Sequence, residues 1–335
     1  MLAETKKAAI PKNWSELCDP IQPFLDEVSD RLQDEVKNFD PQIATFVQYA
    51  LVSRGKQLRP ALVALAARAA GGIKPQHVDI AVIIEMVHLA TLVHDDVVDG
   101  AEVRRNRPTL AANWGNKVSV LAGDCLFAEA LKLAAAFPTT DVCRMVSEAS
   151  KVVCTGEIRQ TLQRGNFQLT RAEYLELVNM KTAALFSLAC ELGGRLAEGT
   201  EDSAAVGLRE YGEQLGTAYQ IYDDCVDVFG TEAQAGKSLG TDLATGKATL
   251  PVLLALEQAD EVERKSWLAL FNDGEGQAET IRARLLERGI PAQCREVVAG
   301  HIAAANEALT DLPGGREPLA ALAGCLTAQL SLLGD

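Results

Sequence analysis

Apolar residues recur at helical spacing along almost the whole chain, and this pattern constrains the fold more than any other feature. Such stripes must be buried, and no segment shows the alternation typical of a half-buried strand. The pattern predicts helices over 17–38, 41–53, 58–71, 75–100, 109–136, 139–161, 171–198, 203–230, 248–270, 276–288, 291–312 and 315–333. We therefore expect an all-α fold: a single large helical bundle of ten or more helices, with residues 1–335 in one domain.

The composition narrows the class of protein further. The 335 residues carry a net charge of −14, which argues against a nucleic-acid partner. None of the eight cysteines forms a CxxC pair, so they are expected to be buried thiols in a reducing compartment. The N-terminus lacks the apolar stretch of a signal peptide, and no apolar run approaches the roughly 20 residues of a membrane span. A cytoplasmic protein without a transmembrane segment is expected.

Two acidic clusters follow apolar helices. "ATLVHDDVVDG" carries Asp95, Asp96 and Asp99, and "YQIYDDCVDVFG" repeats the spacing with Asp223, Asp224 and Asp227. Residues i and i+4 share a helix face, so Asp95 and Asp99 can act together. A lone cluster of this kind is more often a solvated helix end. Carboxylates are unfavourable at a helix C-terminus, however, and two such clusters suggest that they face each other across a metal ion. Oxygen ligands favour Mg²⁺, which often shares its shell with substrate phosphates.

Basic residues flank both clusters, as a phosphate substrate requires. They are Arg54, Lys56 and Arg59 in "RGKQLRP", Arg104, Arg105 and Arg107 in "EVRRNRPT", Lys181 in "MKTAALF", and Lys237 and Lys247 in "GKSLGTDLATGKATLP". Each alone is more often a solvated surface residue. The segment Gly230–Ser238 is similar to a nucleotide-binding P-loop, but five residues separate its glycines where four are needed. We interpret it as a mobile lid whose lysines close over phosphates.

Histidine could also serve the site. His88 precedes Asp95 by close to two helical turns and is expected to face the same side of the helix. For His94 a position within a helix interface is about as plausible as one in the site.

These motifs together resemble the trans-isoprenyl (polyprenyl) diphosphate synthase family, and most of all its long-chain members. The likeness rests on "GKQLRP", "HDDVVDGAEVRRNRPT", "KTAALF", "YQIYDDCVDVFG" and "GKSLGTDLATGKATLP", in family order between about residues 50 and 251. It implies the isoprenoid synthase fold around a central cavity, a homodimer, and Mg²⁺-dependent condensation of isopentenyl diphosphate with an allylic diphosphate. An apolar product would allow loose membrane association.

The resemblance also assigns roles to individual residues. It implies isopentenyl diphosphate contacts for Lys56, Arg59, His88 and Arg105, and allylic diphosphate contacts for Arg104, Lys181, Thr182, Gln220 and Lys237, with Lys247 as a further lid lysine. It implies Mg²⁺ ligation by Asp95, Asp99 and Asp223, supported by Asp96, Asp224 and Asp227. Gln57 and Asn106 depart from the family pattern, which has arginine and glycine at these places.

Product length is expected to depend on Ala90 and Thr91, one turn before the first acidic cluster. In the family, bulky aromatic residues here close the cavity, and this chain has small ones. We therefore expect a long product of six to ten isoprene units. Phe127 or Phe137 on the opposite wall could stop the chain sooner, so a geranylgeranyl or farnesyl diphosphate synthase is the alternative. A type I terpene cyclase or a non-catalytic partner subunit is less expected, since both acidic motifs are intact.

Overall fold

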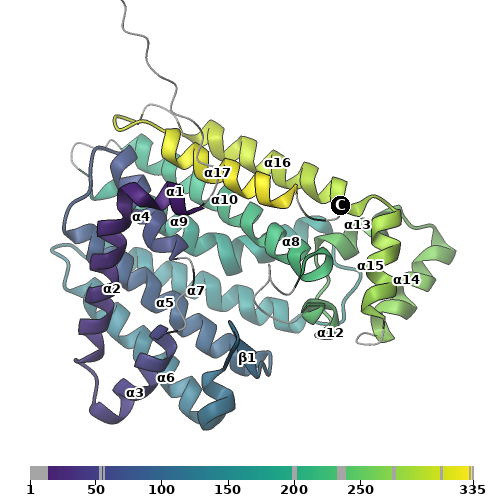
Figure 1. Cartoon of the computed structure of the whole chain (residues 1–335), viewed down its shortest axis with the longest axis horizontal. Coiled ribbons are helices and arrows are strands. Elements are labelled where there is room, and N and C mark those ends of the chain that lie inside the picture. The colour runs from purple at the N-terminus through teal and green to yellow at the C-terminus, as the bar shows by residue number, and fades with distance from the viewer. Residues whose placement is uncertain are drawn as a thin grey trace, which may run out of the picture.

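The computed structural model describes residues 14–52, 55, 57–197, 202–231, 239–273, 277–309, 312–331 and 333, and these are predominantly helical (Figure 1). The elements are α1 (Trp14–Cys18), η1 (Asp19–Ile21), α2 (Gln22–Val36), α3 (Pro41–Val52), α4 (Leu58–Ala69), α5 (Gln76–Val98), β1 (Val103–Arg104), β2 (Arg107–Pro108), α6 (Leu110–Ala135), α7 (Asp141–Leu162), α8 (Arg171–Val178), η2 (Asn179–Ala183), α9 (Ala184–Arg195), α10 (Asp202–Phe229), α12 (Thr241–Ala244), α13 (Leu250–Gln258), α14 (Glu261–Asp273), α15 (Ala278–Glu287), α16 (Ile290–Ala308) and α17 (Glu317–Leu330).

The predicted all-α fold is confirmed, but two predicted helices are divided. The range 171–198 contains α8, the π-helical segment η2 and α9. The range 248–270 is broken at Ala259, which is extended. The carboxylate of Asp260 then accepts the backbone N–H groups of Val262 and Glu263, both at 2.9 Å, and so starts α14. This is the usual role of aspartate at a helix N-terminus.

A two-stranded hairpin was not expected from the sequence. Val103 pairs with Pro108 and Arg104 with Arg107, in antiparallel register. Arg105 and Asn106 form the two-residue turn with φ of 51° and 58°. Positive φ at both central residues is the pattern of a type I′ turn, which asparagine tolerates better than most residues do. Asn106 therefore fits the position where the family pattern has glycine.

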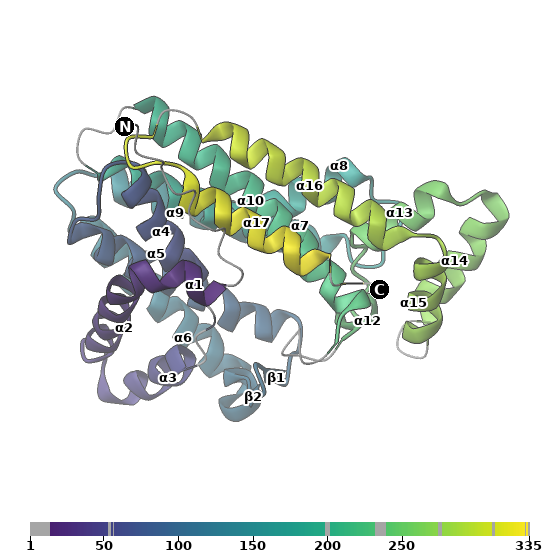
Figure 2. The same cartoon turned by 45° about the horizontal axis from the view of Figure 1, so that its top comes forward.

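The long helix α10 forms the centre of the bundle. It packs on α9 and on α16, while α4 packs on α9 and α5 on α6. Figures 1 and 2 show α16 and α17 running beside α10, with α14 and α15 at the opposite end of the molecule from α2 and α3. Small residues permit the close approach of α10 to η2 and to the start of α9, since a Cβ added at Gly216 would lie 2.7 Å from the Cα of Ala183 and 3.0 Å from the Cβ of Phe186. This approach holds the second acidic cluster beside η2.

Helix α5 is long and apolar enough to cross a membrane by length and composition alone, although 72% of its most apolar window is buried inside the fold. Its residues Ile80–Val87 are all buried, as in a central helix of a bundle. These observations indicate that α5 is a core helix of the bundle. The eight cysteines are all free; five are buried as expected, whereas Cys125 and Cys143 are half-buried and Cys154 is exposed.

Candidate active site

A pocket of about 400 Å³ opens among α4, α5, α7, α9 and α10. Carboxylates from both acidic clusters line it, namely Asp95, Asp99 and Asp223, together with Glu85, Glu157 and Asp242. The cationic residues of its wall are Arg59, Arg104, Arg105, Lys181 and Lys247. His88, Thr91, Thr182 and Gln220 also line it. Residues far apart in sequence thus meet in one polar cavity, where acidic and basic side chains lie close together.

The carboxylates of α5 are held by lysine and arginine. Asp99 accepts from Lys247 at 3.1 Å and also bonds Arg164. Burial favours the protonated form of Asp99, but Lys247 and then Lys181 outweigh it and lower its pKa. Such an environment keeps the carboxylate ionised and able to bind a cation.

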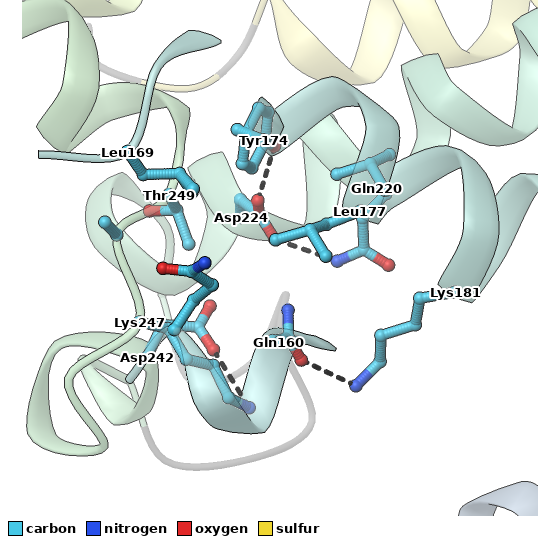
Figure 3. A pocket seen from close by; sticks show the side chains of 13 residues that line it. Gln160, Leu169, Tyr174, Leu177, Lys181, Gln220, Asp224, Asp242, Lys247 and Thr249 are labelled. Atoms are coloured by element: carbon cyan, nitrogen blue, oxygen red, sulfur yellow. Dashed lines mark hydrogen bonds and ion pairs between the residues drawn. The ribbon is translucent and has the colours of Figure 1, made fainter. Parts of the chain in front are cut away.

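Lys181 links α5 to α7. Its ammonium group lies 3.8 Å from Asp95 and donates to Glu157 at 2.9 Å. It also donates to Gln160 at 3.0 Å, a contact that Figure 3 shows. Burial opposes the charge on Lys181, but Asp95 and Glu157 outweigh it and raise the pKa of the ammonium group. Lys181 is therefore a fixed positive charge beside the first acidic cluster.

The other three aspartates of the clusters point away from this pocket. Asp96 bonds Arg104 at 2.7 Å, Asp224 is buried beneath α8, and Asp227 accepts the backbone N–H groups of Thr241 and Asp242 at the start of α12. Consecutive helical residues differ by about 100° in direction, so adjacent aspartates cannot all face one cavity. Burial and the nearby Asp242 raise the pKa of Asp224 to about 8. Of the six aspartates, Asp95, Asp99 and Asp223 line the pocket, and the three named as supporting carboxylates do not.

The donor set still suits a hard cation. In the described part of the chain no three carboxylate, thiol or imidazole groups converge as a ready-made metal centre. Asp95, Asp99 and Asp223 nevertheless offer oxygen donors from two helices to one cavity, and Mg²⁺ takes few protein carboxylates and fills its shell with water and phosphate oxygens. These residues fit Mg²⁺ bound together with an anionic ligand.

A second cationic region lies beside His88. Arg105 reaches it from the hairpin turn, and Gly55 leaves the space, since a Cβ there would lie 2.5 Å from an Nη of Arg105. Arg59 stacks over the Phe186 ring at 5.1 Å, and its Nε is buried without a partner. Burial lowers the pKa of both guanidinium groups. Two guanidinium groups that meet in one cavity are the arrangement that a diphosphate would bind.

His88 is neutral in this environment. Burial, followed by the nearby Arg59 and Arg105, lowers its pKa well below the usual value. A neutral imidazole can donate one hydrogen bond to a phosphate oxygen without adding charge. His94 lies elsewhere: its Nε2 is 3.0 Å from the carbonyl oxygen of Val120 on α6, so it belongs to a helix interface.

The π-helical segment η2 places Lys181 and Thr182 in the wall. A π turn inserts one residue into a helix and often occurs at functional sites. Thr182 donates to the side-chain oxygen of Gln220 at 2.6 Å, joining η2 to α10. Sequence reasoning found these two residues by their motif but missed the π turn.

Several polar residues at the site were not predicted, among them Glu85, Glu157, Gln160, Arg164 and Asp242. Glu157 and Gln160 lie three apart on α7, which is a helix-face pattern that could have drawn attention to them. Lys56 and Lys237, which were predicted to bind substrate, lie outside the described residues, as does segment 232–238 of the expected lid.

The two residues expected to set product length differ in position. Thr91 lines the pocket, and its hydroxyl donates to the carbonyl of His88 at 2.7 Å. Ala90 is fully buried and is not part of the pocket wall. Val153 of α7 and Leu185 of α9 complete the apolar wall near Thr91, whereas Phe127 and Phe137 pack against the core.

Comparisons with known proteins agree with this site. The polyprenyl synthetase family pattern matches residues 40–287. The chain is 31% identical over 319 residues to a short chain isoprenyl diphosphate synthase of Methanothermobacter thermautotrophicus, covering 92% of this chain and 97% of that protein. It is 38% identical over 243 residues to the octaprenyl diphosphate synthase of Escherichia coli, covering 72% and 75%.

One similar protein has been solved with bound ligands. The polyprenyl synthase from Caulobacter crescentus, complexed with calcium and isoprenyl diphosphate, has a TM-score of 0.88 and 32% identity, with 96% of this chain and 99% of that chain covered. The present chain therefore belongs to the polyprenyl synthetase family. The predicted family, fold and prenyltransferase class are confirmed.

Proposed function

We propose that the protein is a Mg²⁺-dependent prenyltransferase that condenses isopentenyl diphosphate with an allylic diphosphate to give an all-trans polyprenyl diphosphate. One observation carries the proposal: a single pocket joins carboxylates of α5 and α10 to separate groups of arginine and lysine. One cationic group beside His88 suits isopentenyl diphosphate, and the other, beside Asp95, suits the allylic diphosphate. The calcium and isoprenyl diphosphate of the Caulobacter protein support metal and substrate of this kind.

Each residue then has a physical task. Asp95, Asp99 and Asp223 would hold Mg²⁺, which supplies positive charge to the leaving diphosphate. Arg104, Lys181 and Lys247 bind the allylic diphosphate and stabilise the charge that develops as its C–O bond breaks.

The second substrate is bound beside the first. Arg59, Arg105 and His88 orient isopentenyl diphosphate so that its double bond attacks the allylic cation. The departed diphosphate takes the proton that is then lost. The apolar wall that includes Leu185 and Val153 keeps water from quenching the cation.

The product is proposed to contain six to ten isoprene units. The small side chain of Thr91 leaves the wall below Asp95 open, and the octaprenyl diphosphate synthase relative is consistent with a long tail. The short chain isoprenyl diphosphate synthase relative is the specific observation in favour of the second candidate, a geranylgeranyl or farnesyl diphosphate synthase.

We further propose a cytoplasmic homodimer whose chain forms one domain. Helix α6 exposes Trp114, Val120, Leu121 and Leu131, and Leu121 is 63% exposed. An apolar helix face of this kind is typical of a protein interface. An apolar product would be released at a membrane surface, to which the protein would bind only loosely.

The test is a product assay. Purified protein is incubated with farnesyl diphosphate, labelled isopentenyl diphosphate and Mg²⁺, and the products are sized by chromatography. We expect a ladder ending at six to ten units, loss of activity with EDTA, and a loss of at least about 100-fold in Asp95→Asn. Asp34→Asn, an exposed position on α2, serves as the matched control and should retain full activity. Products that end at four units or fewer would support the second candidate, and no product with any allylic primer would refute the proposal.

A further inference from the structure

A chain of hydrogen bonds begins on α8 and joins Tyr174 to Asp224 and Asp224 to Gln220 (Figure 3). The hydroxyl of Tyr174 donates to one oxygen of Asp224 at 2.6 Å, and the side-chain amide of Gln220 donates to the other oxygen at 2.8 Å. The hydroxyl of Thr182 then donates to the carbonyl oxygen of Gln220 at 2.6 Å. Four side chains from α8, α10 and η2 thus form one connected network.

Each bond in this network fixes the direction of the next. Asp224 is 5% exposed, and each of its carboxyl oxygens has one partner in the network, Tyr174 on one side and Gln220 on the other. Because the Gln220 amide donates to Asp224, its NH₂ end points toward the carboxyl group. The carbonyl end of Gln220 then points toward Thr182. The orientation of the Gln220 amide, which a free glutamine could reverse, is therefore set by its partners.

Tyr174 itself stands outside the main pocket. It is 4% exposed and lines an adjoining small cavity of about 70 Å³, with Leu169, Leu177 and Thr249 around it. Gln220 lines both this cavity and the main pocket, and Thr182 lines the main pocket. The start of α8 is fixed by a capping box between Thr170 and Glu173, so the Tyr174 ring is held one residue beyond a rigid turn.

We propose that Tyr174 is a positioning residue for the allylic diphosphate, acting through Asp224 on Gln220 and Thr182. The inference rests on the proposed function, in which Gln220 and Thr182 contact that substrate. Without the tyrosine hydroxyl, one oxygen of Asp224 loses its donor, and Gln220 turns to serve both oxygens. The Gln220–Thr182 bond then breaks, and both groups leave the orientation in which they receive the diphosphate.

Steady-state kinetics of Tyr174→Phe test the proposal. The KM for farnesyl diphosphate should rise about tenfold, the loss expected for one hydrogen bond to a buried carboxylate, while the KM for isopentenyl diphosphate stays unchanged. Binding of a thio-linked farnesyl diphosphate analogue, which cannot ionise, should weaken by the same factor in calorimetry. The matched control is Tyr211→Phe, which removes another buried tyrosine hydroxyl of the bundle, bonded to the carbonyl of Leu319 at 2.7 Å. It should lower the melting temperature and leave both KM values unchanged.

A double-mutant cycle separates positioning from simple stability. Tyr174 is proposed to act on Thr182 through Asp224 and Gln220. In a Thr182→Val background, Tyr174→Phe should therefore have little further effect on the KM for farnesyl diphosphate. The same cycle with Tyr211→Phe should be additive. An additive result for Tyr174, or a Tyr174→Phe protein that loses only melting temperature, overturns the inference.

A fallback variant covers the case in which Tyr174→Phe does not fold. Asp224→Leu has a similar size and removes the acceptors of both Tyr174 and Gln220, so the direction of the Gln220 amide is no longer fixed. The farnesyl diphosphate KM should rise selectively, and equal changes in both KM values would count against the network. Wild-type protein that makes no prenyl product refutes the proposed function itself, whereas active wild type with an unaffected Tyr174→Phe refutes the positioning role alone.

Discussion

Thr91→Phe should turn a long-chain enzyme into a short-chain one. Thr91 lies four residues before Asp95 on α5 and lines the same pocket. Its side chain therefore lies about 6 Å below the place proposed for the diphosphate group of the allylic substrate. One extended isoprene unit spans roughly one helical turn of about 5.4 Å. A phenyl ring at this depth therefore obstructs the tail from about its second unit onward, so the product should stop far short of six to ten units.

The substitution should be tolerated by the fold. The Thr91 hydroxyl bonds only the carbonyl of His88 in its own helix, and that carbonyl retains its backbone partner when the hydroxyl is removed. The new ring enters the pocket rather than packed core, so the overpacking cost of about 1–3 kcal/mol should not arise. Ala90→Phe is the matched control, because Ala90 is fully buried outside the pocket wall and should bear that cost.

The assay is chromatographic sizing of products made from farnesyl and geranyl diphosphate, with thermal unfolding measured in parallel. We expect the principal product of Thr91→Phe to end at four units or fewer, with a near-normal melting temperature. Ala90→Phe should lower the melting temperature and shorten the product less. An unchanged product from Thr91→Phe, or stronger shortening by Ala90→Phe, would show that the tail leaves by another route.

Three further predictions concern the cationic region and the outer face. Gly55→Ala should raise the KM for isopentenyl diphosphate selectively, measured by initial rates, because the added methyl group displaces Arg105. The folded-state pKa of His88 is depressed, so the unfolded chain binds more protons below about pH 6.5 and stability falls as the pH drops toward the folded value. The free energy of unfolding, measured by denaturant titration between pH 6.5 and 5, should depend less steeply on pH in His88→Gln, by up to about 1.4 kcal/mol per pH unit. The same dependence in both proteins would contradict this prediction. Leu121→Asp should dissociate the proposed homodimer in analytical ultracentrifugation, and an unchanged sedimentation coefficient would place the interface elsewhere.

Local pattern was sufficient to predict most of the helices. The apolar period over 203–230 matches α10 at Asp202–Phe229, and that over 109–136 matches α6. It was insufficient where one helix ends and a side chain caps the start of the next, as Asp260 does for α14. The hairpin was also missed, since its two-residue strands are too short to show any alternation.

The site was predicted in part for the same reason. The types of residue it needs, carboxylates and cations at helical spacing, can be recognised in the sequence. The acidic clusters, however, give no sign of which aspartates face the pocket. The orientation of α5 and α10 about their own axes places Asp95 and Asp223 in the pocket wall and directs Asp224 toward Tyr174.

The sequence by itself determined most of the helices, because helical periodicity is local, and it determined the available chemistry, because acidic and basic motifs occur together. The tertiary structure decided how these groups are used. Tyr174 and Asp224 lie 50 residues apart, and Lys247 and Asp99 lie 148 apart. Contacts at such separations depend on how the helices pack and rotate against one another, and short-range sequence patterns carry no record of that packing.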